Sequence, residues 1–493
     1  MNIRVRFAPS PTGYVHIGSL RTALYNFLFA RKNKGQFVLR IEDTDRTRLV
    51  EGAIENLLDS LKWAGISHDE GVFIENGKIV QKGEFGPYIQ SERLDIYQSY
   101  IHELIDKGFA YYCFCSKERL EEVRDKQKSE GKTPMYDRHC LNLAKEEAEN
   151  RIKAGEEYVV RLKVPDNEEI KFHDMVRGDV MIHASEIDDQ VLIKSDGYPT
   201  YHFAVVIDDY LMKISHIVRG EEWLTSTPKQ VVLYNYYGWK VPDFVHLPTV
   251  LNKDKKKLSK RQGDVSVTDF LNKGYLPEAL VNYLALVGWS PKDNKELFTM
   301  DELIEEFSFD RVSNAGGVFD VDKLNWINSH YIRQSDNEDL FELAIHHISE
   351  AGRDTEENIR RDKDRYIKII DLVKEKLDNM SQINKHLDVF FGNEVSFENE
   401  EVVDTLQQEH VKRLLNAFMV KLNETETVDE EFSANIFNVL KSETGAKGKG
   451  LFMPIRAAVT GQLHGPDMGK TFIILGKSLL IRRIEFVLDA LNN

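Results

Sequence analysis

The chain has 493 residues and a formal net charge of −16 at pH 7, from 65 lysines and arginines against 81 aspartates and glutamates. Its 42% hydrophobic and 30% charged residues exclude a disordered chain, and three cysteines exclude a disulfide-bonded scaffold. The length predicts about three domains, and the acidic balance argues against a general polyanion binder without excluding local basic surfaces.

The first 45 residues predict a strand, a helix and a second strand. Hydrophobic and charged residues alternate over 3–7, and two prolines and a glycine then end the strand. Apolar residues recur at helical spacing over 18–32, and 37–41 is a second, buried strand that we expect to run parallel to the first. This order predicts a Rossmann-like α/β domain whose site lies beyond the carboxyl ends of the strands.

The rest of the chain changes character twice. Residues 91–160 are aromatic and charged, and strand patterns return over 190–250, at 205–207 and 214–218. An α+β insertion into the first domain explains this order. Beyond about 325, helical patterns dominate and predict a separate all-helical domain. The predicted later helices cover 117–130, 338–351, 361–379 and 408–423.

The turn after the first strand carries His16 and Gly18. A helix N-terminus offers free N–H groups and a positive dipole end, which suit phosphate, and a glycine lets a nucleotide approach the backbone closely. His16 can donate to a phosphate oxygen as negative charge builds up there. The alternative is a loop histidine with no ligand.

A basic loop, 253–261, holds six basic residues and one acidic residue. Its lysines can neutralise a leaving pyrophosphate if the loop closes on a polyphosphate. The alternative is a solvated surface loop.

Together these two motifs resemble the signature motifs of class I aminoacyl-tRNA synthetases, and further segments narrow the resemblance to the glutamyl-tRNA synthetases. The matching segments follow the family's order over nearly the whole chain, at 6–13, 21–26, 40–45, 219–223, 257–261, 316–320 and 453–456. Ser19 stands where many class members have a second histidine, which leaves His16 as the one histidine of that motif.

The resemblance implies a fold and a reaction. The fold is a Rossmann-like class I catalytic domain with an α+β insertion, followed by an all-helical anticodon-binding domain. The reaction activates L-glutamate with ATP and Mg²⁺ to glutamyl-adenylate and moves the glutamyl group to the 3′ end of tRNA(Glu) for protein synthesis. The expected domains are a catalytic part at 1–92 and 192–248, an inserted acceptor-stem-binding part at 93–191, a stem-contact region at 249–325 and an anticodon-binding part at 326–493.

The N-terminus lacks a signal-like apolar stretch, and no run approaches 18 apolar residues. We therefore expect no membrane partner. The small number of cysteines favours a reducing cytoplasm, and we expect a monomer.

The resemblance also assigns site residues. The expected catalytic residues are His16, Lys257 and Lys260. The expected ATP-binding residues are His16, Gly18, Ser19, Trp223, Leu258, Ser259, Lys260 and Arg261. The expected glutamate-binding residues are Arg6, Ala8, Ser10, Glu42, Tyr201 and Arg219. Charge supports the last set, because a selective site for glutamate needs cations for two carboxylates and an anion for the ammonium group. By resemblance, Arg219 holds the side-chain carboxylate and Glu42 the ammonium. Some family members have asparagine where this chain has Val205, so that contact is not carried over.

Cys113, Cys115 and Cys140 have the spacing of zinc ligands. Some glutamyl enzymes use a histidine two residues past the last cysteine, where this chain has Asn142. Tyr136 or His139 could complete a zinc site, and a metal-free remnant is the alternative. The sequence leaves this choice open, as it does the charging of tRNA(Gln) and the identity of anticodon-reading residues.

Residues 445–493 hold seven lysines and arginines against three acidic residues, which predicts phosphate contacts in the last domain. Within that segment, Arg482 and Arg483 fit a helix surface as well as an RNA contact.

Four alternative functions explain less of the chain. The relative that glutamylates queuosine in tRNA lacks an anticodon domain, and the glutaminyl enzyme usually carries β-barrels after its catalytic domain. A small-molecule nucleotidyltransferase shares the histidine motif without needing so large a helical domain. A tRNA-binding protein without activity would leave the motif lysines idle.

Overall fold

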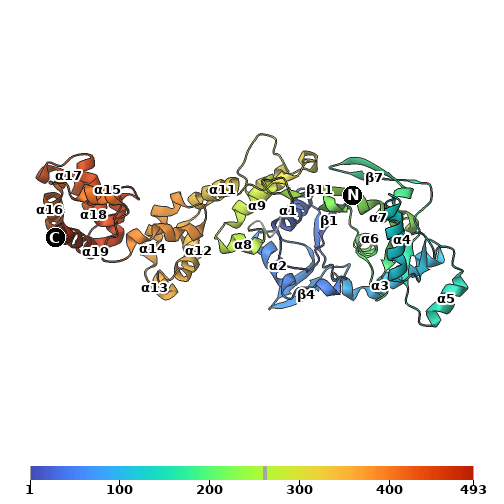
Figure 1. Cartoon of the computed structure of the whole chain (residues 1–493). Coiled ribbons are helices and arrows are strands. Elements are labelled where there is room, and N and C mark those ends of the chain that lie inside the picture. The colour runs from blue at the N-terminus through green and yellow to red at the C-terminus, as the bar shows by residue number, and fades with distance from the viewer. Residues whose placement is uncertain (1, 259–263, 492–493) are drawn as a thin grey trace. The chain divides into compact units, whose positions relative to one another are not determined.

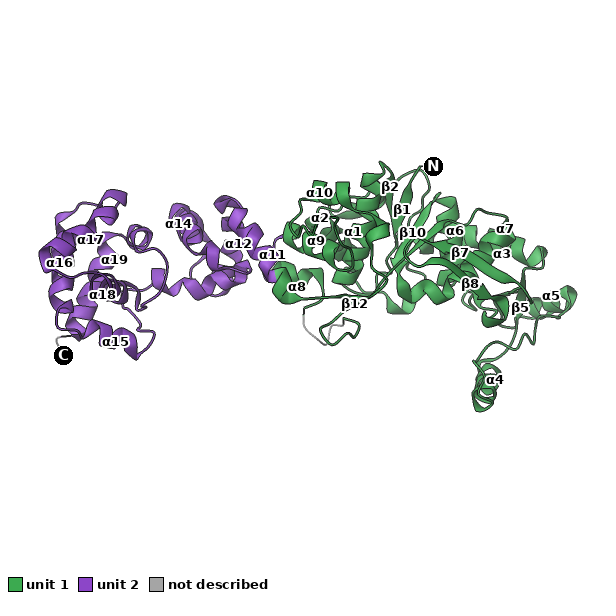
Figure 2. Ribbon diagram, turned by 90° about the horizontal axis from the view of Figure 1, so that it is seen from above, with its two compact units in different colours: residues 1–272, 277–324 green, residues 273–276, 325–493 purple. Residues whose placement is uncertain are grey.

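The computed structural model describes residues 2–258 and 264–491. The chain folds into two compact units, one of residues 1–272 and 277–324 and one of residues 273–276 and 325–493 (Figure 2). The first unit holds all the described strands, and the described part of the second is built of helices and turns (Figure 1). The predicted fold class, an α/β part followed by a helical part, is confirmed.

The chain opens with the predicted β-α-β unit. β1 and β2 pair in parallel with Phe7 opposite Leu39, and Leu20, Leu24 and Leu28 of α1 are fully buried. The sheet order is β1-β2-β3-β4, with β3 parallel to β2 and β4 antiparallel to β3. The bounds are β1 Arg4–Phe7, α1 Ile17–Lys32, β2 Gln36–Leu39, α2 Ala53–Trp63, β3 Glu70–Glu75 and β4 Lys78–Lys82.

A second sheet continues the first at β1. The backbone N–H of Ser215, just before β10, donates to the Arg4 carbonyl at 2.8 Å, and further along both strands the side chain of Arg6 reaches Val218. The order of strands in this second sheet is β10-β11-β7-β8, with β10, β11 and β7 parallel and β8 antiparallel to β7. The bounds are β7 Glu169–Asp174, β8 Gly178–His183, β10 His216–Gly220 and β11 Asp243–Leu247. The carboxyl ends of β1, β2, β10 and β11 therefore meet on one side of the molecule.

One predicted strand is wrong. Residues 205–207 lie within helix α6 (Tyr201–Leu211), in which every side chain from Phe203 to Asp209 is buried. A short apolar run fits a buried helix as well as a buried strand, because neither has a polar face to reveal its period. The other predicted strand, 214–218, corresponds to β10.

The segment between the two parts of the α/β region carries a small antiparallel sheet of order β5-β6-β9. The bounds here are α3 Leu94–Asp106, β5 Ala110–Cys113, α4 Lys117–Ser129, α5 Lys145–Lys153, β6 Val159–Leu162 and β9 Val191–Ile193. Strands β7 and β8 lie inside the expected insertion, 93–191, yet β7 pairs with β11 of the second large sheet. The predicted helix over 117–130 matches α4, which buries no residue.

The first unit ends in helices that follow the second large sheet. A two-residue parallel pair, β12 with β13, links the segment after β11 to residues 317–318. The bounds are α7 Thr227–Tyr237, β12 Val250–Leu251, α8 Val267–Asn272, α9 Pro277–Leu286, α10 Met300–Glu306 and β13 Gly317–Val318.

The second unit matches the predicted helices closely. The prediction over 361–379 is partly wrong, because α13 ends at Arg361 and α14 ends at Val373. The helices are α11 Val321–Gln334, which begins in the first unit, α12 Asn337–Glu350, α13 Glu356–Arg361, α14 Lys363–Val373, α15 Glu400–Leu406, α16 Val411–Glu424, α17 Glu430–Thr444, α18 Lys449–Thr460 and α19 Met468–Ala490.

Arg482 and Arg483, adjacent on α19, have different environments. Arg482 is exposed, whereas Arg483 is 2% exposed. The guanidinium of Arg483 donates at 2.7 Å to each of the carbonyls of Val389, Phe391 and Val459. Burial lowers its pKa to about 10. Arg483 is therefore a structural residue of this unit.

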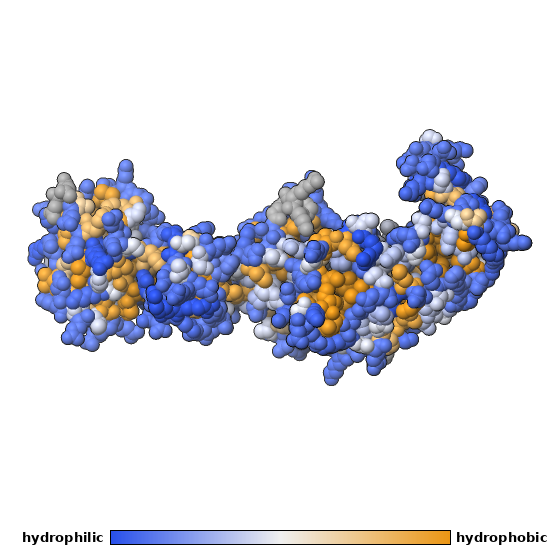
Figure 3. All heavy atoms as spheres, turned by 90° about the horizontal axis from the view of Figure 1, so that it is seen from below, coloured by the Kyte–Doolittle hydropathy of each residue, from blue (hydrophilic) through white to orange (hydrophobic). Residues whose placement is uncertain are grey.

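Among the described helices, none combines the length and the apolar composition that crossing a membrane requires. On the face drawn in Figure 3, hydrophilic residues are interrupted by scattered apolar areas on both units.

Candidate active site

Two adjoining cavities open at the carboxyl ends of the parallel strands. The first, here called the arginine cavity, has a volume of about 660 Å³ and includes Arg6, Ala8, Ser10, Glu42, Tyr201, Arg219 and Trp223 in its lining. The second, here called the histidine cavity, has a volume of about 390 Å³ and includes His16, Gly18, Arg21, Thr249, Lys257 and Leu258. Ser19, Thr22, Gly220 and Glu222 line both. All six expected glutamate-binding residues thus lie around one cavity, and the described ATP-binding residues other than Trp223 lie around the other.

Arg219, near the carboxyl end of β10, is a buried cation held by neutral groups. Its Nε lies 3.1 Å from His246 Nε2, its Nη2 donates to Thr227 Oγ1 at 2.8 Å, and its Nη1 donates to Tyr201 Oη at 3.2 Å. Arg219 is 4% exposed, and no carboxylate of the described residues lies within ion-pair distance of it. Burying an unpaired charge is costly, so this site is suited to an anionic ligand.

Three other buried arginines beside the arginine cavity are paired with carboxylates. Arg6 Nε lies 3.0 Å from Asp209 Oδ1, and Arg40 lies 2.8 Å from the same oxygen and 3.0 Å from Glu42 Oε1. Arg93 Nε donates to Asp208 at 2.7 Å. Arg6, Arg40 and Arg93 thus face Asp208, Asp209 and Glu42, one carboxylate for each guanidinium, whereas Arg219 has no such partner among the described residues. Arg21, in the histidine cavity, is also buried without an ion pair to a described residue, and it donates to the backbone carbonyls of Val287 and Pro248.

Glu42 is a buried carboxylate in the lining of the arginine cavity. It follows β2 and is 5% exposed. Burial raises the pKa of Glu42, and Arg40 and Arg6 oppose that shift. The cavity therefore has a cationic group, Arg219 of β10, and a carboxylate, Glu42 of the segment after β2.

Tyr201 and Trp223 form an aromatic wall beside Arg219. Their ring centroids are 4.1 Å apart with an interplanar angle of 31°. Burial raises the pKa of Tyr201, so its hydroxyl stays neutral. Trp223, expected to contact the nucleotide, lies in the lining of the arginine cavity and packs against Tyr201.

His16 forms the N-cap of α1. Its Nδ1 accepts the backbone N–H of Gly18 at 3.0 Å, which places the proton of the neutral ring on Nε2. A Cβ on Gly18 would lie 3.3 Å from that Nδ1, so glycine accommodates both the cap and a ligand's approach. The turn thus presents a helix N-terminus with an imidazole donor beside it.

The described part of the basic loop reaches the histidine cavity through Lys257 and Leu258. The backbone N–H of Leu258 donates to the Val250 carbonyl at 3.0 Å, and Lys257 and Leu258 line the cavity. Ser259, Lys260 and Arg261, which the sequence assigns to the ATP site, lie outside the described residues. Lys253 is directed elsewhere, with its Nζ 2.8 Å from Asp322 Oδ2.

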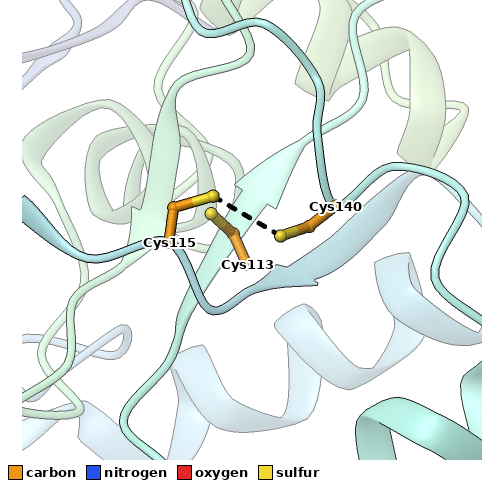
Figure 4. A group of neighbouring side chains, drawn as sticks. All are labelled: Cys113, Cys115 and Cys140. Carbon is orange, nitrogen blue, oxygen red and sulfur yellow. Dashed lines mark hydrogen bonds between the residues drawn. The ribbon is translucent and has the colours of Figure 1, made fainter. Parts of the chain in front are cut away.

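The three cysteines gather in the small antiparallel sheet. Cys113 ends β5, Cys115 follows it and Cys140 comes from a later loop, and their Sγ atoms all lie within 4.8 Å of one another (Figure 4). Tyr136 Oη lies 3.3 Å from Cys113 Sγ and 3.4 Å from Cys115 Sγ. His139 and Asn142 are exposed. Hydrogen bonds from Cys140 and Tyr136 lower the pKa of Cys113 and favour its thiolate.

Comparison with known proteins identifies the family. A family model described as tRNA synthetases class I (E and Q), catalytic domain, matches residues 2–326, and an anticodon binding domain model matches residues 339–488. The chain belongs to the class I tRNA synthetases of the E and Q type.

Glutamate–tRNA ligases of several bacteria are similar to this chain over almost its whole length. Glutamate–tRNA ligases from Clostridioides difficile and Alkaliphilus metalliredigens are 58% identical over 488 residues and 55% identical over 490 residues, each alignment covering 99% of both chains. The crystal structure of a glutamate tRNA ligase from Elizabethkingia meningosepticum, in complex with its amino acid, has a TM-score of 0.89 and 35% identity and covers 100% of each chain.

Sequence reasoning about this synthetase missed the groups that hold Arg219. His246 lies on β11, Thr227 begins α7 and Asp174 ends β7, and all three are fully buried. The one sequence signal was a histidine at an inward position of an apolar strand, two residues after Phe244. The pairing of β7 with β11 that brings Asp174 there could not be derived from the local pattern.

Proposed function

We propose that this protein is a glutamate–tRNA ligase, which activates L-glutamate with ATP to glutamyl-adenylate and transfers the glutamyl group to the 3′ end of tRNA(Glu). The observation that carries the proposal is Arg219, a buried cation facing a cavity with no carboxylate partner among the described residues. The family membership of the chain and the names of its relatives support it.

The charges of the arginine cavity match those of glutamate. Arg219 binds the side-chain carboxylate, because the planar guanidinium fork suits a carboxylate. Glu42 receives the ammonium group. Arg6, Ala8 and Ser10 at the end of β1 then line the space for the remaining α-carboxylate, which must reach towards the histidine cavity.

The histidine cavity is suited to the triphosphate. An α-carboxylate oxygen of glutamate forms a bond to the α-phosphorus of ATP, the bond from that phosphorus to the pyrophosphate oxygen breaks, and pyrophosphate leaves. His16 Nε2–H and the N-terminus of α1 stabilise the charge that develops on the phosphate oxygens. Lys257 and Lys260 neutralise the leaving pyrophosphate, while Gly18, Ser19, Trp223, Leu258, Ser259 and Arg261 complete the nucleotide site.

Magnesium accompanies the ATP. This ion keeps several waters and binds mostly through substrate phosphates. Glu222, which lines both cavities, would be a carboxylate within the site for such a complex. The role of the magnesium ion is to neutralise phosphate charge.

We also propose a structural zinc ion held by Cys113, Cys115, Cys140 and Tyr136. A structural zinc site has four ligands, and the phenol oxygen of Tyr136 is the fourth donor next to the three sulfurs. Phenolate is an uncommon ligand. The exposure of His139 and Asn142 favours Tyr136 in this chain.

The tRNA is bound by both units in this proposal. Residues 93–191 and 249–325 contact the acceptor stem, and residues 326–493 read the anticodon. The enzyme acts as a cytoplasmic monomer.

Aminoacylation of purified tRNA(Glu) with labelled amino acids tests the proposal. We expect charging with glutamate and little charging with glutamine at equal concentration. Preferential charging with glutamine, or none with glutamate, would overturn it.

A further inference from the structure

Asp174, at the end of β7, is a buried carboxylate whose oxygens all point at donors. Oδ1 accepts the backbone N–H groups of Val176 at 2.9 Å and Arg177 at 2.8 Å. Oδ2 accepts both the backbone N–H of His246, at 3.0 Å, and its ring Nδ1, at 2.6 Å. These four contacts fix the orientation of the carboxylate and its contact with the imidazole.

This contact determines which nitrogen of His246 carries the proton. Nδ1 must donate to Asp174, so the neutral ring has a bare Nε2 that accepts from Arg219 Nε at 3.1 Å. Burial lowers the pKa of His246, with Asp174 opposing the shift, and so favours the neutral ring. A second proton, on Nε2, would point at a guanidinium N–H and break the contact.

The result is an arginine that is fixed in place and still charged. Three neutral acceptors, from His246, Thr227 and Tyr201, each take one of the five guanidinium N–H groups. One N–H on each terminal nitrogen is left for a ligand. The carboxylate of Asp174 contacts the far side of the His246 imidazole and does not contact Arg219 itself. It can therefore orient Arg219 through His246 while the guanidinium N–H groups that would bind a ligand stay available.

We propose that Asp174 and His246 are positioning residues that hold Arg219 for the side-chain carboxylate of glutamate. The inference rests on the proposed function, in which Arg219 binds that carboxylate. Mutation of residues that orient a binding group from behind typically lowers affinity or activity by about 10- to 100-fold.

A matched pair of variants tests the proposal. His246→Asn keeps a donor near the Nδ1 position for Asp174 and removes the acceptor that faces Arg219. His246→Gln places an amide oxygen near the Nε2 position and keeps that acceptor. We expect His246→Asn to raise the KM for glutamate about 10-fold or more and to leave the KM for ATP within about twofold of the wild-type value. In His246→Gln, the KM for glutamate should stay within about threefold of the wild-type value.

His216 offers a control from the same sheet. It is a buried histidine three residues before Arg219 on β10, outside the lining of both cavities, and contacts Ser215 at 2.8 Å. We expect His216→Asn to leave the KM for glutamate unchanged. Asp174→Asn should raise the KM for glutamate as His246→Asn does. An amide donor that faces His246 Nδ1 moves the ring proton to Nε2, which then no longer accepts from Arg219.

Two results would overturn the inference. The first is an unchanged KM for glutamate in both His246→Asn and Asp174→Asn. The second is an equal increase in the KM for glutamate and the KM for ATP in His246→Asn that is also seen in His246→Gln. The wild-type protein in the same assay separates this failure from failure of the proposed function. If the wild type does not charge tRNA(Glu) with glutamate, the function is wrong; if it charges and these variants behave like wild type, only the positioning role is wrong.

Discussion

Arg219 is buried with its charge unbalanced, beside three arginines that each have a carboxylate partner. An ion taken out of water without a partner costs several kcal/mol. A ligand carboxylate recovers part of that cost, whereas an amide of the same size does not. At the scale of single residues, we therefore expect Arg219 to favour glutamate over glutamine.

We predict that Arg219→Gln raises the KM for glutamate about 100-fold, corresponding to about 3 kcal/mol for hydrogen bonds to a charged group. The KM for ATP should change little, because the arginine lies in the other cavity. Steady-state aminoacylation at varied glutamate and varied ATP measures both.

Arg48 is the control for that variant. It lines the same cavity, but its side chain is 70% exposed. Arg48→Gln should change the KM for glutamate by less than about threefold, as expected for a solvated charge. Equal effects of the two substitutions would contradict the role of Arg219.

His202, next to Tyr201, predicts a pH dependence of stability. Burial lowers its pKa in the folded protein to about 4, below the value of about 6.5 in an unfolded chain. The unfolded state therefore binds more protons between these values, and stability falls as the pH drops from 6.5 towards 4. At pH 5 the cost is about 2 kcal/mol from this residue.

Urea unfolding at pH 7 and pH 5, for the wild type and His202→Asn, measures this contribution. The loss of stability on acidification should be smaller in the variant. An equal loss in both proteins would show that His202 does not titrate in this way.

At the scale of elements, the sequence pattern predicted the helices and strands that have one polar and one apolar face. The first β-α-β unit and the amphipathic helices near 338–351 and 408–423 were of this kind. The buried run 205–207 was not, because a helix with no polar face looks like a buried strand. The pairing of β7 with β11 joins residues about 70 positions apart, and such pairing leaves no local trace.

The same reasoning explains which site residues could be predicted. The motifs assigned His16, Arg6, Glu42 and Arg219 to a site, and these residues lie around the two adjoining cavities; their roles stay predictions. Asp174, His246 and Thr227 act through contacts between separate elements and could not be found. Arg483 resembled a surface cation in the sequence, although its guanidinium joins α19 to the 389–392 loop and the end of α18.

Arg483 therefore predicts a stability effect for the second unit. Arg483→Met should lower the free energy of unfolding by about 3 kcal/mol or more, because several buried carbonyls lose their donor. Arg482→Met, on the adjacent exposed position, should change it by less than about 0.5 kcal/mol. Urea titration followed by circular dichroism compares them, and similar midpoints would contradict the structural role of Arg483.

The cysteine cluster predicts a metal effect confined to the insertion. Purified protein should hold about one zinc ion per chain, measured by elemental analysis, and Cys140→Ser should reduce that content. Chelation should lower the thermal midpoint, since a structural ion binds the folded state. Protein that contains no zinc when prepared in its presence would show that the cluster is a metal-free remnant.

At the scale of the whole molecule, the net charge of −16 and a tRNA partner are compatible because the charges are unevenly distributed. The positive groups that remain exposed include Lys447, Lys449 and Arg482 in the second unit. A net-acidic protein repels polyanions in general and binds one only where shape and local charge agree. The charge of the chain thus favours selectivity over affinity for tRNA.

The central claim is that one protein joins glutamate, ATP and tRNA at these two cavities. The most direct measurement is the rate at which the wild type charges tRNA(Glu) with each of the twenty standard amino acids in the presence of ATP and Mg²⁺. We predict glutamyl-tRNA as the main product, with AMP and pyrophosphate released in step with it. Preferential charging with an amino acid that lacks a side-chain carboxylate, or ATP turnover with no aminoacyl-tRNA formed, would contradict it.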